Sequence, residues 1–143
     1  MKIEDIKNAV LAIVAGIGTV IAKFCGGWDT AMQTLVFVMA VDYITGLIVA
    51  GVFKRSNKSS GGALDSRAGF KGLCKKGVVL LIVMLSTYLD RMVGTDTVVR
   101  TATILFFIGN EGLSVIENIG LMGVPFPPSI KNALEALQKK SEK

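Results

Sequence analysis

The chain has 143 residues, room for a single domain, and 51% of them are hydrophobic. Together with a mean hydropathy of +0.57, this indicates an integral membrane protein rather than a soluble domain, whose apolar share is usually about 45–50%. The formal net charge is +5 and there is no His, so the commonest general base and a frequent metal ligand are missing. Nucleophile-elbow, P-loop and metal-ligand motifs are missing too, which argues against an enzyme and against a cofactor.

The first apolar run predicts a membrane span at about 8–24. Small residues recur in it four positions apart, a spacing that lets two helix backbones approach closely in lipid. The pairs are Ala12 with Gly16, and Gly18 with Ala22. We interpret them as a helix-packing surface. The alternative is a glycine-rich helix with no partner on that face, since Gly is common in membrane helices.

The second run, 30–53, is long enough to cross a hydrocarbon core, which needs roughly 20 mostly apolar residues of helix. Asp42 lies near its middle, where a carboxylate is costly and usually faces other helices or water. Gly46 and Ala50 form a further close-packing pair.

A hydrophilic segment, 54–76, follows the second run. Short loops rich in Lys and Arg stay in the cytoplasm, and the same side chains attract anionic lipid. We therefore expect a cytoplasmic loop in contact with lipid, and no nucleic-acid partner. Its basic residues are Lys54, Arg55, Lys58, Arg67, Lys71, Lys75 and Lys76.

The third apolar run is short, and it reaches a spanning length, 73–93, only if charged residues at both ends join the helix. The alternative is a shallow interfacial helix, which would leave three spans. The fourth run predicts a span at 98–124. The tail, 125–143, predicts a short amphipathic helix on the inner membrane surface or against a neighbouring subunit. Its apolar face comprises Ile130, Ala133, Leu134 and Leu137.

Four spans with a cytoplasmic loop between the second and third place both termini in the cytoplasm. Residues 1–143 then form a single all-α membrane domain. Cys25 and Cys74 lie near opposite faces of the membrane in this arrangement, which excludes an intrachain disulfide.

The fourth run carries a polar stripe, because residues three and four apart share one face of a helix. Two adjoining rows make up the stripe: Asn110, Ser114 and Glu117, and beside them Glu111, Ser114 and Asn118. A charge at mid-bilayer costs roughly 2.5–3.5 kcal/mol on translocon-based scales, so the stripe must face protein or water. It predicts interhelical hydrogen bonds, or a surface that becomes water-lined on assembly, with Asp42 turned toward it.

Three motifs and a proline-bounded ending stand out from the apolar pattern. They are Asp42–Gly46 (DYITG), Ser66–Gly72 (SRAGFKG) with Lys75 and Lys76, Asn110–Asn118 (NEGLSVIEN), and Gly123–Pro125 with Pro127. These residues resemble the toxin-secretion and phage-lysis holin family, found in phages of Gram-positive bacteria and in clostridial toxin loci. The resemblance runs from about residue 40 to the end, and its most specific part is the last motif with the prolines after it.

This resemblance implies a small protein that accumulates in the host bacterial cytoplasmic membrane, forms a homo-oligomer and opens lesions. An endolysin, or a toxin in toxin loci, then passes out to the wall, and an endolysin lyses the cell. An antiholin is a further partner, and the family has no cofactor and catalyses no reaction. Two alternatives stay open. One is a multi-span ion or proton transporter or channel subunit that uses Asp42 and Glu111, and the other is a compact soluble helical protein.

Overall fold

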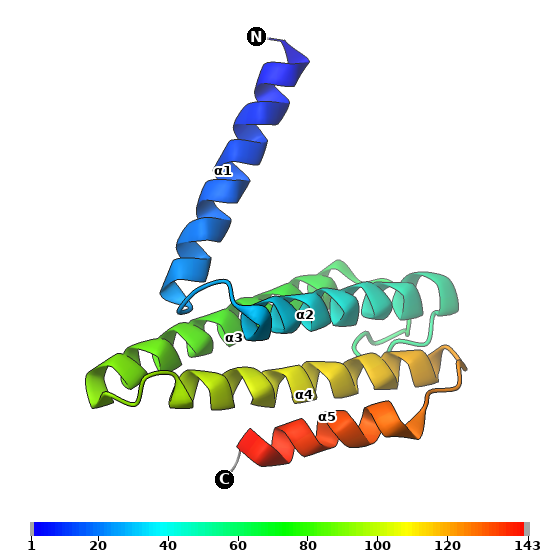
Figure 1. The fold of residues 1–143 in the computed structure, drawn as a ribbon. Helices are drawn as coiled ribbons and strands as arrows, with labels where there is room; N and C mark the ends of the chain where they lie inside the picture. Colours follow the sequence, from blue (N-terminus) through cyan, green and yellow to red (C-terminus); the bar gives the residue numbers. More distant parts are fainter. Residues whose placement is uncertain (1, 142–143) are drawn as a thin grey trace.

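A computed structural model describes residues 2–141, whose regular secondary structure is helical, with no strand (Figure 1). Residues 1, 142 and 143, the outermost parts of the expected domain and tail, lie outside the described residues. The elements in chain order are α1 (Ile3–Phe24), α2 (Thr30–Ile48), a π-helical turn η1 (Val49–Phe53) that continues α2, α3 (Ser66–Val93), α4 (Val98–Leu121) and α5 (Pro128–Ser141).

Four of these helices are long and apolar enough to cross a membrane: α1, α2 with η1, α3 and α4. The third run, short as an apolar stretch, forms a helix of 28 residues. Residues 66–72, which we expected only in the loop, belong to this helix as well. The reason is a side-chain cap, because the carboxylate of Asp65 accepts a hydrogen bond from the backbone N–H of Arg67 at 2.8 Å.

Helix α4 lies at the centre of the fold and contacts α2, α3 and α5 (Figure 1). The apolar core lies between α2, α3 and α4 and includes one residue of the α1–α2 linker. Its buried members are Cys25, Met32, Leu35, Met39, Val79, Val83, Ile104 and Ile108. We call the end formed by the loop 54–65 and the start of α3 the basic end. The end formed by the linker 25–29 and the turn 94–97 is the turn end.

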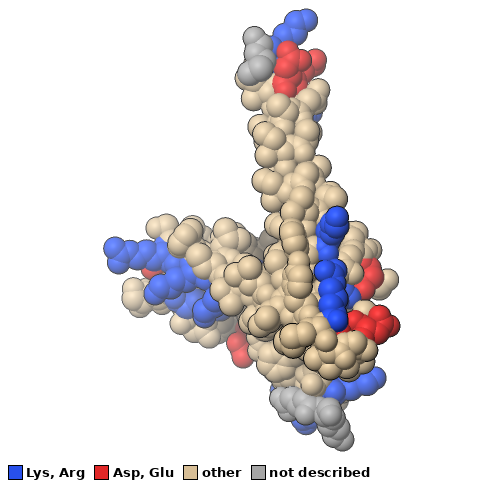
Figure 2. All heavy atoms as spheres, turned by 90° about the vertical axis from the view of Figure 1, so that its left-hand side faces the viewer, with Lys and Arg blue, Asp and Glu red and all other residues tan. Residues whose placement is uncertain are grey.

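Helix α1 projects away from this bundle and has no buried residue (Figure 1). Figure 2 shows that it is free of charged side chains along most of its length and carries them at its tip. The positions around Gly16 and Gly18 are open, with no atom within 4 Å of an added Cβ. The expected packing pairs of α1 therefore make no close contact within one chain, although Ala22 is partly buried at its base.

Helix α5 folds back along α4, where Figure 1 shows the two side by side. Gly109 and Gly112 make this approach close, because a Cβ at Gly112 would lie 2.6 Å from Leu134 Cδ2 and one at Gly109 would lie 2.9 Å from the Leu134 carbonyl oxygen. Leu134 and Leu137 pack against the core. The tail thus contacts its own chain, which is neither of the two positions that we expected for it.

Candidate functional site

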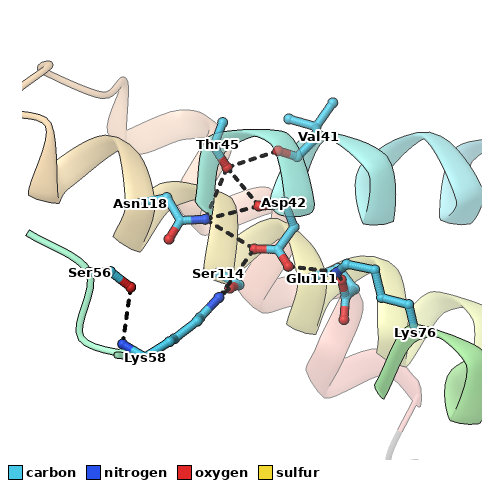
Figure 3. A network of polar contacts seen from close by, with 9 residues as sticks. All are labelled: Val41, Asp42, Thr45, Ser56, Lys58, Lys76, Glu111, Ser114 and Asn118. Carbon is cyan, nitrogen blue, oxygen red and sulfur yellow. Dashed lines mark hydrogen bonds and ion pairs between the residues drawn. The ribbon is translucent and has the colours of Figure 1, made fainter. Parts of the chain in front are cut away.

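Three helices bring charged and polar side chains together near the middle of the bundle (Figure 3). Asp42 and Thr45 come from α2, Lys76 comes from α3, and Glu111, Ser114 and Asn118 come from α4. Lys58 reaches the same place from the loop 54–65. We call these seven residues the charged network.

Lys76 is the centre of the charged network. Its Nζ lies 2.6 Å from Asp42 Oδ2 and also contacts Glu111 Oε2. The side chains of Lys76, Asp42 and Glu111 are 12%, 9% and 11% exposed. An ammonium group between two carboxylates satisfies both acids at once, which makes their burial tolerable.

Asn118 joins Asp42 to α4. Its Nδ2 donates to Asp42 Oδ1 at 3.1 Å, to the Asp42 carbonyl oxygen at 3.2 Å and to Thr45 Oγ1 at 3.0 Å. Gly46 lies beside this contact, and a Cβ there would be 3.7 Å from the same nitrogen, an ordinary van der Waals distance. We expected Asp42 to turn toward the polar face of the fourth helix, and this contact confirms it.

Lys58 covers the network from the loop. Its Nζ lies 3.9 Å from Asp42 Oδ1 and donates to Ser114 Oγ at 3.4 Å, while its side chain is half exposed. Two carboxylates and two ammonium groups make the network electrically neutral. Within residues 2–141, every buried side-chain nitrogen and oxygen has a hydrogen-bond partner. The buried polar groups of the site are thus all hydrogen-bonded in a single copy of the chain.

The polar stripe of α4 divides at Ser114. Glu111 and Asn118 are buried in the network, whereas Asn110 and Glu117 are exposed. Successive residues are turned by about 100° around a helix, so Asn110 and Glu117 lie roughly a third of a turn from the buried edge of the stripe. The structure brings Asp42, Glu111, Ser114 and Asn118 together and leaves the other two outside.

The remaining predicted residues lie around this site. Ala50 is buried one turn beyond Gly46 on α2. Among the basic residues of 54–76, Lys58 and Lys76 pair with acids, and the others form no ion pair with any described residue. These others are Lys54, Arg55, Arg67, Lys71 and Lys75.

A second charged cluster joins the helices at the turn end. Arg100 on α4 is only 3% exposed. Its Nη1 donates to Asp29 Oδ2 at 2.7 Å, and its Nε donates to the carbonyl oxygen of Cys25 at 2.5 Å. This contact leaves no room for a side chain at Gly26, where a Cβ would lie 2.6 Å from Arg100 Nε and where φ is +86°. Arg100 therefore anchors the α1–α2 linker to α4.

Two acids of this cluster also cap helices. Asp29 accepts from the N–H of Met32 at the start of α2 at 2.9 Å. Asp90 accepts from the N–H groups of Val99 and Arg100 at 2.9 and 2.7 Å, which satisfies the first turn of α4. The hydrogen bond from Arg100 holds the pKa of Asp29 below its usual value, and burial raises the pKa of the Cys25 thiol.

Neither this second cluster nor the role of Lys76 was predicted from the sequence. Asp29 stands directly before an apolar run, and an acid there is a helix-start signal that was available. No equivalent signal existed for Lys76, since Lys75 and Lys76 are neighbours of the same type. Within residues 2–141, no group of three His, Cys, Asp or Glu side chains is placed to hold a metal ion.

Comparison with known proteins places the chain in a family. Residues 19–139 match the Bacteriophage holin family. An uncharacterised 14.9 kDa protein in the nagH 3′ region of Clostridium perfringens is 34% identical over 138 residues, which is 96% of this chain and 98% of the relative. An uncharacterised protein of Listeria monocytogenes is 33% identical over 90% of this chain and 86% of its own length.

A relative from Bacillus phage phi105, named a probable holin, is 31% identical over 111 residues, or 78% of this chain and 76% of the relative. No solved structure matches the chain. The match of the family over most of the sequence agrees with the motifs at Asp42–Gly46 and Asn110–Asn118, and it extends the similarity into α1. This protein belongs to the bacteriophage holin family.

Proposed function

We propose that this protein is a holin that accumulates in the host cytoplasmic membrane, assembles with copies of itself and opens lesions in that membrane. An endolysin made in the cytoplasm, or a toxin in a toxin locus, leaves through these lesions, and no reaction is catalysed. The observation that carries the proposal is the family match over residues 19–139. The probable holin of Bacillus phage phi105 supports it as a relative.

The distribution of charge supports an orientation. The basic end carries Lys54, Arg55 and Lys58 in the loop and Arg67 at the start of α3. Because short loops rich in Lys and Arg remain inside, the basic end faces the cytoplasm in our proposal. With four spans, both termini are then cytoplasmic and the turn end faces outward.

The charged network suggests how assembly switches the protein from a closed form to an open one. In one copy its charges are neutralised by residues of the same chain. In an assembly, the polar edge of α4 can face water if the network opens, and the exposed Asn110 and Glu117 already lie beside it. Opening exchanges internal ion pairs for hydration and for contacts between copies.

The substitution Glu111→Gln tests this switch. It removes one of the two carboxylates around Lys76, weakens the closed form and brings membrane depolarisation forward in time. Glu117→Gln is the matched control, because it makes the same chemical change on the same helix at an exposed position. Depolarisation timed with a voltage-sensitive dye should be earlier for the first variant alone. Unchanged timing in both would remove the network from the mechanism.

The function itself is tested by inducing the protein in bacteria with and without a cytoplasmic endolysin. We expect sudden lysis only when both are present, and loss of viability with the protein alone. The enzyme should appear in the medium at lysis.

A transporter or channel subunit remains the second candidate, because Asp42 and Glu111 do meet around one cation. It would change ion gradients and leave the membrane tight to a folded endolysin. Retention of the enzyme after full induction would therefore favour the transporter and contradict the holin.

A further inference from the structure

A cavity of about 380 Å³ opens at the basic end, between α2, α3, α4 and the loop 54–65. A volume of this size is within the range of small-molecule sites, which is about 300–1,000 Å³. Small residues of α3 leave the space open, since Ala68, Gly69 and Gly72 line it. Tyr43 of α2 also lines it, with its hydroxyl 3.6 Å from the position of a Cβ at Gly69.

Some of the charged residues that line the cavity already have a partner, and others do not. Lys58 and Lys76 form part of its wall together with Asp42 and Glu111, the acids with which they pair in the charged network. Asp65 is used as the cap of α3. Lys71 and Lys75 also line the cavity and have no acidic partner among the described residues.

Lys71 and Lys75 are one helical turn apart, so their side chains leave the same face of α3. Two ammonium groups at this spacing suit an anionic group with several oxygens, such as a phosphate. The Tyr43 hydroxyl has no hydrogen bond to another described residue and is free to donate. In Figure 2, Lys and Arg side chains gather on one flank of the helical body.

The depth of the cavity matches that of lipid headgroups. Helix α3 has 28 residues and is about 42 Å long, whereas a hydrocarbon core is about 30 Å thick. Most of the surplus belongs at the basic end, because Arg67, Lys71 and Lys75 lie there, whereas the charged residues of the other end, Asp90 and Arg91, lie within its last turn. These residues are therefore at the level of the headgroups while the rest of α3 crosses the core.

Apolar side chains surround the same site. Leu47 of α2 lines the cavity and is 39% exposed, and Ala50 and Ala63 form further parts of its wall. Exposed apolar residues next to unpaired lysines suit a ligand with an acyl chain as well as an anionic group. A free phosphate ion would make no use of them.

We propose that this cavity binds the phosphate of an anionic phospholipid, held by Lys71, Lys75 and the Tyr43 hydroxyl, with the acyl chains along Leu47 and Ala50. The proposal requires the membrane location but not lysis. Its failure is therefore distinguishable from failure of the holin function.

The experiment measures enrichment of phosphatidylglycerol around the full-length protein in phosphatidylcholine nanodiscs, by native mass spectrometry. The double variant Lys71→Gln with Lys75→Gln should lower apparent affinity about tenfold. The matched control is Lys54→Gln with Arg55→Gln, which removes the same charge from the same segment at residues that do not line the cavity. We expect the control to retain most of the enrichment, and unchanged thermal unfolding to show that both variants fold.

Two further experiments test where the ligand binds and whether it is a lipid. Tyr43→Phe keeps the charge and should lower affinity severalfold, and no change would contradict a phosphate inside the cavity. Equal losses in the two double variants would mean general attraction to the membrane surface and would overturn the proposal. Displacement of the lipid by millimolar inorganic phosphate would show a site for the free anion and would also overturn it.

Discussion

At the scale of single residues, the stability of the molecule depends on the few cationic groups that neutralise its buried acids. Lys76 contacts both Asp42 and Glu111, while Lys75 beside it on α3 is exposed and has no ion pair among the described residues. The two lysines differ only in their direction around the helix, by about 100°. Removing one partner of a buried ion pair leaves an uncompensated charge, which is far more costly than losing a surface charge.

We therefore predict that Lys76→Met destabilises the protein by about 3–5 kcal/mol. Unfolding in detergent, followed by circular dichroism as denaturant is added, measures the change in free energy. Lys75→Met is the control and should lie within about 0.5 kcal/mol of the wild type. Equal losses in the two variants would mean that the network does not stabilise the fold.

The Asp29–Arg100 pair predicts a pH dependence at the turn end. The pKa of Asp29 is lowered from 3.8 by Arg100, so the pair stabilises the fold above about pH 4 and this contribution is lost as the pH falls through the lowered value. Its size is about 1 kcal/mol or less, because Asp29 is half exposed. The only Trp of the chain, Trp28, reports on this linker.

Trp28 fluorescence should be constant from pH 7 to 5 and change below about pH 4. Asp29→Asn keeps a good helix cap but removes the titrating group, so it should abolish the acid transition at this site. A transition of the same size in the variant would assign it to another carboxylate.

Part of this residue-scale picture was predictable from the sequence. A lone acid in an apolar helix needs a polar partner, and the only dense polar stripe is on the fourth run, so the approach of Asp42 to α4 followed. The choice between Lys75 and Lys76, and between the two edges of the stripe, depends on helix rotation. Rotation is set by packing against neighbours, which local sequence does not report.

At the scale of elements, α4 owes its central position to small residues on one face and polar residues on another. Gly109 and Gly112 admit α5, while Glu111 and Asn118 point into the charged network. Hydropathy sufficed to predict four spans, because length and composition decide whether a helix can cross a membrane. It could not predict where α5 lies, because two glycines on a distant helix determine that position.

Gly112→Val should detach α5, because the added Cβ would lie 2.6 Å from Leu134. Overpacking of this kind costs about 1–3 kcal/mol, which raises the detached fraction roughly five- to hundredfold. Limited trypsin digestion at Lys139 and Lys140 in detergent measures the change. Gly120→Val is the control on the same helix, with no atom within 4 Å of its Cβ, and should digest at the wild-type rate.

At the scale of the whole molecule, α1 is an apolar helix with no buried residue. It joins the bundle through the glycine-containing linker that Arg100 anchors. Since the small residues around Gly16 make no contact within the chain, we assign them to contacts between copies. The sequence indicated the packing surface, and the fold shows that Gly16 and Gly18 make no close contact within the chain.

Gly16→Leu should weaken self-association about tenfold, because a large side chain prevents close approach of helix backbones. Cross-linking in isolated membranes, resolved by size, measures the oligomer fraction. Ile17→Phe adds bulk at an exposed position on the opposite side of α1 and should leave that fraction unchanged. Identical ladders from both variants would move the contact to another helix.

The position of α5 has a consequence for how the molecule sits in lipid. Lys131, Lys139 and Lys140 are exposed on a helix that runs beside α4 as far as its middle, a depth at which each charge is costly in hydrocarbon. The outward sides of α1 and α3 are apolar, so the molecule is amphipathic in the plane of the bilayer, with one apolar flank and one charged flank. In the proposed oligomer, the charged flank of each copy faces water or another copy instead of lipid.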